Sequence, residues 1–420
     1  MARGETVGNG ASHGRRRAVT RLSHGASTMA AMADATPEVI LYVVDAGGGH
    51  RATANALAAA AEQRRAPFRL TIRSMRDVLA PLDVGRRLGG NGLEDVYNAM
   101  VRRQMTRHLV SLLRGFQWTI RLLHPLLVRL VAEDLRRHRP AMVLSLFPNF
   151  NAVIADGVRL ACPETPFHVL LTDFADFPPH FWMEKDKGGV IVGTGEAARQ
   201  ATELGVPPDR VVRTSGMVLH PRFYPRGTPE RRRRTRLELR LPETEPVILV
   251  LFGGKGSPEM AALCEALLRH VPQARILAVC GDNPDLLFRV SRLAMDSLDR
   301  LRPLGFTDRV ADLMGASDLL LTKPGPGSLA EAFHQQVPVV VCGNTLTIPQ
   351  ERFNVRFVES QGLGVSVGGW RDMAAAAARL LADPATLSTL RRNLGHLPEN
   401  RALYEVIDLI GEAIADPARA

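Results

Sequence analysis

Residues 316–332 read ASDLLLTKPGPGSLAEA. The apolar run that ends at Leu321 has the composition of a buried strand, and the residues from Ser328 onward follow a helical pattern. Between them, Gly325 and Gly327 clear space above the start of the helix, where backbone amides around Ser328 can hold phosphate oxygens. The stretch predicts a strand, a loop and a helix of a parallel α/β domain, with an anion site at the carboxyl edge of its sheet.

Glu331 lies one turn into this predicted helix, three residues after Ser328. A carboxylate at that place can accept hydrogen bonds from both hydroxyls of a ribose. The alternative is a capping box, because Ser328 and Glu331 have the S-x-x-E spacing that caps a helix without any ligand. The spacing alone leaves both interpretations open.

Short apolar runs alternate with helical patterns on both sides of this stretch. The runs are VILYVV, MVLSLF, FHVLLT and GVIVG in the first half, and PVILVLFGG, ARILAVCG, SDLLLTK and PVVVCGN in the second. Each series predicts a parallel sheet with crossover helices, so we expect an α/β chain with two Rossmann-like, doubly wound domains facing a central cleft. We assign 1–36 to a disordered leader, 37–220 to the first domain and 221–420 to the second, whose C-terminal tail can cross back.

The basic charge is concentrated in one segment. The chain carries a net charge of +10, and residues 84–139 hold eleven arginines and no lysine against four carboxylates. This concentration indicates a local anionic partner and not general affinity for nucleic acid. The four cysteines are widely spaced without a CxxC pair, which argues against a disulfide framework and a zinc site and fits a reducing cytosol.

A second glycine-rich loop follows the first apolar run. Gly47, Gly48 and Gly49 precede His50 there, and a helical pattern begins directly afterwards. Three glycines let the backbone turn sharply near a ligand, and a histidine at the loop tip can act as a general base at neutral pH. The alternative is a simple turn from strand to helix.

Two further groups of polar residues follow predicted strands of the second domain. In one, Gly254, Lys255 and Gly256 form a loop that is not a Walker A motif but can bring an ammonium group to a diphosphate; the alternative is a surface hairpin. The other comprises Gln350, Glu351 and Asn354, which can hydrogen-bond sugar hydroxyls at the ligand-binding edge of the sheet. Singly, each of these three is better explained as a solvated helix start.

Taken together, the motifs resemble those of the monogalactosyldiacylglycerol synthases and the bacterial diacylglycerol glucosyltransferases. They are similar, more distantly, to the N-acetylglucosaminyltransferase that makes lipid II. The matching parts are DAGGGHRATANAL, LLTDF, FGGKGSP, LGFTDRVADLMGASDLLLTKPGPGSLAEA and PQERFN, in that order. The resemblance implies a GT-B glycosyltransferase. Three departures, at Lys255, at Pro324 and at Phe147-Pro148-Asn149, bear on the donor and acceptor preferences.

The resemblance also implies a role for each matching residue. On the donor side, the diphosphate would be held by Gly325, Gly327 and Ser328, and the ribose by Glu331. The uracil would lie against Phe306 and Gly305. The hexose would face Gln350 and Glu351, which Asn354 supports, and the donor site would be completed by Gly254, Lys255 and Gly256. On the acceptor side, Gly47, Gly48, Gly49 and Asp173 would line the cleft. His50 is the expected catalytic base.

The arginine-rich segment has its own helical pattern. Apolar residues recur mainly at spacings of three and four from Leu109 to Val131. A second stripe is formed by Arg107, Arg114 and Arg121. Pro125 must kink or divide the helix. Phe116 and Trp118 suit the headgroup level of a membrane. The alternative is a core-packed helix with a solvated arginine face. The lack of lysine and the position in the family's membrane-binding region favour contact with an anionic membrane surface.

We therefore expect an inverting hexosyltransferase that moves a hexose from a UDP-sugar to a membrane lipid acceptor, with diacylglycerol the first candidate. No stretch reaches the roughly 20 apolar residues that span a bilayer, so we expect a cytoplasmic protein bound peripherally to the inner face of the cell membrane. No Asp-x-Asp pair stands where it could clamp an ion, so we expect no cofactor and no obligatory active-site metal. The alternatives are a UDP-sugar epimerase or hydrolase of the same fold, and a non-catalytic nucleotide-sugar-binding protein at the membrane.

Overall fold

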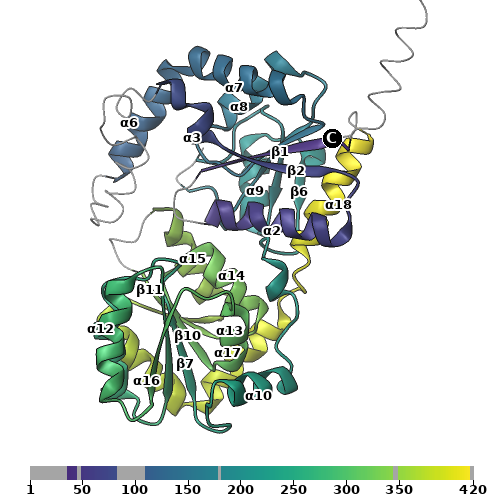
Figure 1. The fold of residues 1–420 in the computed structure, drawn as a ribbon. Coiled ribbons are helices and arrows are strands. Elements are labelled where there is room, and N and C mark those ends of the chain that lie inside the picture. Colours follow the sequence, from purple (N-terminus) through teal and green to yellow (C-terminus); the bar gives the residue numbers. More distant parts are fainter. Residues whose placement is uncertain (1–35, 45–48, 83–108, 178–180, 344–348, 417–420) are drawn as a thin grey trace, which may run out of the picture.

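Two six-stranded parallel sheets carry the fold, one in each half of the chain. The computed structural model describes residues 36–44, 49–82, 109–177, 181–343 and 349–416. Figure 1 shows the two sheets one above the other, each flanked by helices. The expected architecture of two Rossmann-like α/β domains is confirmed.

The N-terminal sheet has the strand order β2-β1-β3-β4-β5-β6. Its central strands are β-branched or leucine-rich and are buried on both faces, which is typical of parallel sheets covered by helices. The strands are β1 (Glu38–Val43), β2 (Arg69–Ser74), β3 (Met142–Ser145), β4 (Phe167–Leu170), β5 (Gly189–Val192) and β6 (Val211–Arg213). The helices of this half are α2 (Gly49–Arg64), α3 (Met75–Val78), α6 (Leu109–Leu122), α7 (His124–His138), α8 (Asn151–Ala161) and α9 (Gly195–Leu204), with short 3-10 helices η1 (Ala80–Leu82) and η3 (Pro208–Arg210).

The C-terminal sheet has the strand order β12-β11-β10-β7-β8-β9. The strands are β7 (Val247–Leu251), β8 (Arg275–Gly281), β9 (Leu301–Gly305), β10 (Leu319–Thr322), β11 (Val339–Cys342) and β12 (Gly364–Val367). The helices are α10 (Pro229–Glu238), α11 (Met260–His270), α12 (Pro284–Met295), α13 (Val310–Ala316), α14 (Pro326–His334), α15 (Pro349–Ser360), α16 (Met373–Ala382), α17 (Pro384–His396) and α18 (Ala402–Ala415), with η4 (Pro221–Phe223) and η5 (Trp370–Asp372). In Figure 1, α14 and α15 lie on the side of this sheet that faces the N-terminal half.

The last helix, α18, packs on the N-terminal sheet. Leu403, Val406 and Ile410 belong to the same buried apolar cluster as Val39 and Leu41 of β1. Figure 1 shows α18 beside α2, and the two helices are in contact. The end of the chain therefore crosses from the second half of the molecule to the first.

The two connections between the halves lie side by side. Asn400 Nδ2 donates to the carbonyl of Met217 at 2.8 Å, and the Ser215 amide donates to Glu405 Oε2 at 2.7 Å. The amide of Leu403 also donates to the hydroxyl of Tyr224, at 2.8 Å. These bonds tie the segment that leads into the second sheet to the segment that returns from it.

In the described part of the arginine-rich segment, residues 109–138 form two helices, α6 and α7. Pro125 occupies the first turn of α7, and Leu123 lies between α6 and α7. The expected division at Pro125 is confirmed, and it has a simple cause, because proline has no amide hydrogen and cannot continue a helix at this point. Leu127 and Val131 of α7 are buried in the N-terminal core.

Candidate active site

His50 lies in the first turn of α2, directly after the glycine-rich loop. Its ring Nδ1 and the hydroxyl of Thr172 are hydrogen-bonded at 2.9 Å, and its ring lies 5.5 Å from the ring of Trp182. Burial lowers the pKa of His50 to about 4. The imidazole is therefore neutral at pH 7, as a proton acceptor must be.

The glycines before His50 are only partly described. Gly47 and Gly48 lie outside the described residues, whereas Gly49 begins α2. In the described part of the chain, no atom lies within 4 Å of a side-chain carbon added at Gly49. The first turn of α2 contains no acidic residue that would compete for an anion or a polar ligand.

Asp173 and Trp182 form the wall beside His50. The Trp182 indole donates to Asp173 Oδ2 at 2.8 Å, and Asp176 Oδ1 accepts from the backbone amides of Phe181 and Trp182 at 3.0 and 2.8 Å. Burial raises the pKa of Asp173 to about 6, the indole hydrogen bond opposes this rise, and the nearby Asp176 carboxylate adds to it. A buried carboxyl group with a raised pKa is typical of functional sites.

The loop between β10 and α14 has the geometry of an anion site. Gly325 is the N-cap residue of α14, Pro326 is its first residue, and the cap makes no side-chain hydrogen bond. The first-turn amides of Gly327 and Ser328 have no carbonyl one turn earlier in the helix to accept them. Among the residues that the structure describes, none comes within 4 Å of a side-chain carbon added at Gly327.

The capping-box alternative is wrong. Ser328 is the third residue of α14 and not its N-cap, so it cannot form the reciprocal pair with Glu331. Glu331 is half-buried, and burial raises its pKa to about 8, with the Arg222 guanidinium opposing the rise. At pH 7 the Glu331 side chain is therefore mostly a neutral carboxyl group, and it is not used as a helix cap.

Arg222 is a neighbour of Glu331 that the sequence did not indicate. It comes from η4 in the connection between the two sheets, and it donates to the carbonyl of Asp308 at 2.8 Å and to His220 Nδ1 at 2.9 Å. The loop after β9 that contains Asp308 also carries Phe306, which is 76% exposed. An exposed ring can offer a stacking surface for a base.

Glu351 lies in the first turn of α15 and faces the loop before α14. Its Oε1 would be 3.7 Å from a side-chain carbon placed on Gly325. Burial raises the pKa of Glu351 to about 7; the Asp173 carboxylate from the N-terminal half adds to this rise, and the Lys323 ammonium opposes it. The Asp173 carboxylate is therefore near enough to Glu351 to influence its pKa, and Lys323 is a nearby cation that the sequence did not indicate.

Asn354 has a supporting role. It is fully buried, and its Nδ2 donates to the carbonyl of Pro324 at 2.7 Å. It therefore holds the loop in place and does not face open space. The side chain of Gln350 lies outside the described residues.

The loop after β7 depends on its glycines. Gly253 and Gly256 have positive φ angles of 80° and 60°, and a side-chain carbon on Gly256 would lie 2.7 Å from the carbonyl oxygen of Cys280. Gly254 has nothing within 4 Å of such a carbon, and its carbonyl accepts from the amide of Asp282 at 2.9 Å. The side chain of Lys255 is exposed at the tip of this loop.

The residues assigned to membrane contact fall into three groups. Arg107 and the side chain of Arg114 lie outside the described residues, whereas Arg121 is exposed on α6. Trp118 is 65% exposed. Phe116 instead turns toward the core, with its ring 6.1 Å from the ring of Phe150, so its assignment to the headgroup level is not supported.

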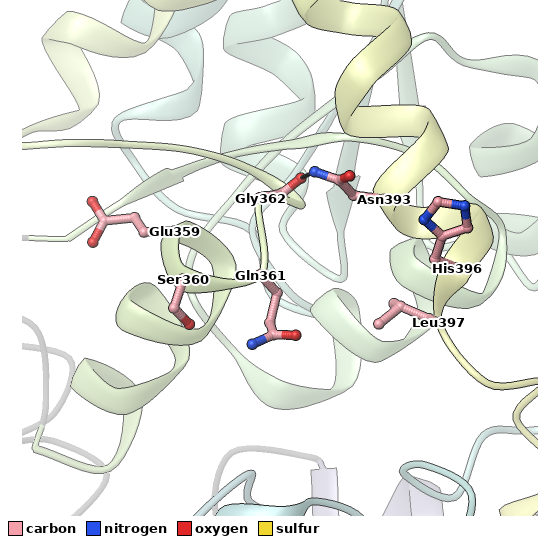
Figure 2. Close-up of a pocket in the computed structure, with 7 residues that line it drawn as sticks. All are labelled: Glu359, Ser360, Gln361, Gly362, Asn393, His396 and Leu397. Carbon is pink, nitrogen blue, oxygen red and sulfur yellow. Dashed lines mark hydrogen bonds between the residues drawn. The ribbon is translucent and has the colours of Figure 1, made fainter.

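A separate pocket of about 410 Å³ lies at the far end of α15. Figure 2 shows its lining, which comes from the last residues of α15 and of α17 and includes Glu359, Asn393 and His396. Glu359 of this lining lies eight residues after Glu351 in α15, which is about 12 Å along the helix at 1.5 Å per residue. The lining includes none of the residues assigned to the site.

Comparisons with known proteins identify the family of the C-terminal half. Residues 247–366 match the Glycosyltransferase family 28 C-terminal domain. The chain is 25% identical over 392 residues to the chloroplastic monogalactosyldiacylglycerol synthase of Spinacia oleracea, covering 90% of this chain and 72% of that protein. It is 27% identical over 272 residues to the processive diacylglycerol beta-glucosyltransferase of Bacillus subtilis strain 168, covering 64% of this chain and 67% of that protein.

Solved structures share the fold at low identity. Acinetobacter baumannii MurG superposes with a TM-score of 0.57 at 13% identity, covering 90% of this chain and 99% of MurG. Anabaena HepE in complex with UDP and glucose gives a TM-score of 0.52 at 15% identity, covering 90% and 100%. The chain is therefore a hexosyltransferase of the GT-B fold that carries a family 28 C-terminal domain and is homologous to the monogalactosyldiacylglycerol synthases and the bacterial diacylglycerol glucosyltransferases.

Proposed function

We propose that the protein transfers a hexose, with inversion, from a UDP-sugar to the hydroxyl of a membrane lipid, most simply diacylglycerol. The observation that carries the proposal is the position of residues 172–177. Thr172 is hydrogen-bonded to His50, and Phe174 and Phe177 contact rings of α14 and α15, the helices that carry the anion site and Glu351. The segment beside the proton acceptor therefore packs against the helices that carry the anion site. The two curated relatives are named for reactions on diacylglycerol, and HepE was crystallised with UDP and glucose.

In this mechanism the neutral imidazole of His50 takes the proton of the acceptor hydroxyl. The acceptor oxygen attacks the anomeric carbon as the bond from that carbon to the diphosphate oxygen breaks, and UDP leaves with the electron pair. Attack from the face opposite the leaving group inverts the anomeric centre. The first-turn amides of α14 and the ammonium of Lys255 counter the charge that develops on the diphosphate.

The proposal includes no cofactor and no obligatory active-site metal, because amides and lysine side chains supply the positive charge. Among the residues that the structure describes, no three His, Cys, Asp or Glu side chains gather in a way that could hold an ion. Turnover measured after divalent ions are removed with EDTA tests this part directly. Loss of activity that Mg²⁺ or Mn²⁺ restores would contradict it.

The acceptor side is proposed to rest on an anionic membrane surface. We call Trp118, Leu122, Leu123 and Leu126 the α6–α7 corner; their side chains are 65%, 63%, 39% and 42% exposed. Arg121 and Arg129 are exposed on the same two helices. Exposed apolar side chains flanked by arginines are typical of helices that bind the interface of anionic bilayers. In the described part of the chain, each helix is too short or too polar to span a bilayer.

An assay of UDP release tests the proposed reaction. UDP-glucose, UDP-galactose and UDP-N-acetylglucosamine are each offered with diacylglycerol, ceramide and a polyprenyl phosphate, and the anomeric configuration of the product is read by NMR. We expect release that depends on a lipid acceptor and a product of inverted configuration. Retained configuration would refute the single-displacement mechanism.

The half-buried carboxyl groups of the site leave one alternative worth measuring. Asp173, Glu331 and Glu351 are the kind of groups that an epimerase or hydrolase of this fold would need. The homology to transferases favours transfer, and the two reactions differ in their products. Free N-acetylmannosamine or free hexose formed without any acceptor would favour the alternative.

A further inference from the structure

One short segment joins the acceptor-side residues to the donor-side helices. Residues 172–177, which we call the connecting segment, follow β4 in the N-terminal half. Thr172 is hydrogen-bonded to His50, and Asp173 accepts from the indole of Trp182. The first two residues of the segment are therefore linked to His50, Thr172 directly and Asp173 through Trp182, whose ring lies 5.5 Å from that of His50.

The other end of the segment reaches into the C-terminal half. The ring of Phe174 lies 5.3 Å from the ring of Phe357 in an edge-on arrangement and 6.2 Å from the ring of Phe333. The ring of Phe177 stacks on that of Phe353 at 6.2 Å. Phe333 belongs to α14, and Phe353 and Phe357 belong to α15.

A cation strengthens the second of these contacts. The guanidinium carbon of Arg356 lies 5.7 Å from the centre of the Phe177 ring and 5.9 Å from that of Phe353. Aromatic pairs contribute about 0.5–1.5 kcal/mol beyond the area that they bury, and a cation over a ring adds about 0.5–1 kcal/mol at an exposed site. Phe174 itself is 2% exposed, so the contact forms a small core between the two halves.

The backbone of the segment is fixed to the N-terminal half. Thr194 Oγ1 donates to the carbonyl of Phe174, and Gln200 accepts from the Asp176 amide at 2.7 Å and donates to the Asp176 carbonyl at 3.2 Å. The segment therefore combines a backbone held by the N-terminal half with rings that pack on α14 and α15. Such a segment can set the distance between the acceptor-side residues and the donor-side residues, which we call the two half-sites. The same two helices carry Ser328, Glu331 and Glu351.

We propose that Phe174 and Phe177 are positioning residues that hold His50 and Asp173 in register with the donor-binding helices α14 and α15. This inference rests on the proposed function, because it takes these helices as the donor side. The rings touch no substrate. A displacement of about 1 Å between a base and its substrate can lower turnover by about a hundredfold, so loss of the rings should lower kcat without weakening donor binding.

The decisive test uses Trp182 as a reporter. The chain has three tryptophans, and replacing the other two by Trp118→Phe and Trp370→Phe leaves Trp182, which contacts His50 and Asp173, as the remaining one. UDP is added to the full-length protein, binding is measured by calorimetry, and Trp182 emission is followed. We expect UDP to change the emission in this background, and Phe177→Leu to abolish most of the change while UDP affinity stays within about twofold.

Matched variants separate positioning from folding. Phe177→Tyr keeps the ring and should restore the response. Phe150→Leu also removes a buried ring, but that ring stacks on Phe147 within the N-terminal half, so the response should persist. In turnover, Phe177→Leu should lower kcat about ten- to a hundredfold with the donor KM nearly unchanged.

Two results would overturn the inference. An unchanged Trp182 response together with an unchanged kcat in Phe177→Leu would show that the rings do not position the half-sites. A parent protein that fails to bind UDP would instead remove the proposed function, and the inference would fall with it. Calorimetry distinguishes the two cases, because it reports UDP binding independently of Trp182.

Discussion

His50 is a neutral base in an apolar setting. The ring of Trp182 lies 5.5 Å from its ring at a tilt of 58°, and Thr172 occupies Nδ1, which leaves Nε2 as the nitrogen that can meet a substrate. Its lowered pKa keeps it unprotonated in the cell but also makes it a weak base. The acceptor proton must therefore leave as the bond to the sugar forms, when the alcohol oxygen is already more acidic.

Replacing His50 by alanine should lower kcat by about two to four orders of magnitude, the usual contribution of a general base. UDP affinity should stay unchanged, since His50 belongs to the N-terminal half and the phosphate loop to the other. Steady-state UDP release and calorimetry measure the two quantities. A fall of less than tenfold would point to another base, and Asp173→Asn would then be compared as the next variant.

Glu331 should make the stability of the nucleotide-free protein depend on pH. Its folded-state pKa of about 8 lies above that of an unfolded glutamate, so the unfolded chain releases the proton first and stability falls as pH rises through this window. Glu331→Gln removes the ionisation. The free energy of unfolding of the Gln variant, relative to that of the parent, should therefore increase as the pH is raised to about 8.

Urea unfolding at several pH values measures this difference between parent and variant. The same variant should bind UDP-sugar more weakly, because Gln is a poorer acceptor for two ribose hydroxyls, and Glu331→Ala should be weaker still. A donor KM equal to that of the parent in both variants would remove Glu331 from the site. Because Ser328 and Glu331 form no capping box, neither change should unwind α14.

The sequence predicted those site residues whose role shows in local spacing. Ser328 and Glu331 sit one turn apart after a strand, and His50 follows three glycines, so each could be found from its own neighbourhood. Lys323, Arg222 and Trp182 could not, because their importance comes from contacts made after folding. Trp182 lies 132 positions from His50 along the chain, and no periodicity connects the two.

At the scale of elements, the central strands were predicted and the edges were missed. β2, β6, β9 and β12, which the apolar runs did not indicate, are the four edge strands of the two sheets. Edge strands pack on fewer neighbours, so their residues are only half-buried and include Arg69, Arg73 and Pro303. A search for apolar runs finds strands buried on both faces, and it fails where a sheet meets solvent.

The first turn of α14 allows a prediction with opposite effects on stability and binding. Gly327→Ala places a methyl group where the structure has open space, and alanine is a better helix former than glycine by about 1 kcal/mol. The free energy of unfolding should not fall, and it should rise by up to that amount. UDP binding should weaken at least tenfold, because the methyl group occupies the space that a phosphate would enter.

Gly395→Ala is the matched control for this change. Gly395 lies in α17 of the same half of the molecule, and a methyl group there also meets nothing within 4 Å. Stability should respond in the same direction in both variants, while UDP binding should change only in Gly327→Ala. Equal UDP affinity in the two variants would show that the anion site lies elsewhere.

At the scale of the whole molecule, segments of the chain cross between the two halves and connect them. α18 completes the N-terminal core, the two connections hydrogen-bond to each other, and the connecting segment inserts its rings between α14 and α15. The sequence indicated two domains and a tail that can cross back, but not the aromatic contact between them. Contacts between distant segments leave no pattern in either segment alone.

Membrane binding should depend on the α6–α7 corner. Trp118→Ser with Leu122→Ser removes two of its exposed apolar side chains without touching the cleft, so folding and UDP affinity should persist. Flotation with vesicles that contain anionic phosphatidylglycerol measures the partition. Each apolar side chain that leaves the bilayer costs roughly 1.5–3 kcal/mol, so binding should fall by at least a hundredfold.

Two further variants distinguish the effect of the arginine charges, and of the position of the apolar side chains, from nonspecific hydrophobic binding to vesicles. Arg107→Gln, Arg114→Gln and Arg121→Gln together remove three charges, at about 1 kcal/mol each near an anionic surface, and should weaken binding in the same way as added salt does. Phe288→Ser with Met295→Ser is the control, since these side chains of α12 are 65% and 75% exposed but belong to the C-terminal half. That control should bind vesicles as the parent does.

Activity decides whether this surface serves the reaction. With diacylglycerol presented in anionic vesicles, the corner and arginine variants should lose turnover in proportion to their loss of binding, because the acceptor reaches His50 only from the bilayer. With a short-chain acceptor in micelles they should retain parental turnover, since the phosphate loop and His50 are intact. A parent protein that ignores anionic vesicles at low salt would rule out the membrane surface as a partner, and a soluble acceptor would become the better hypothesis.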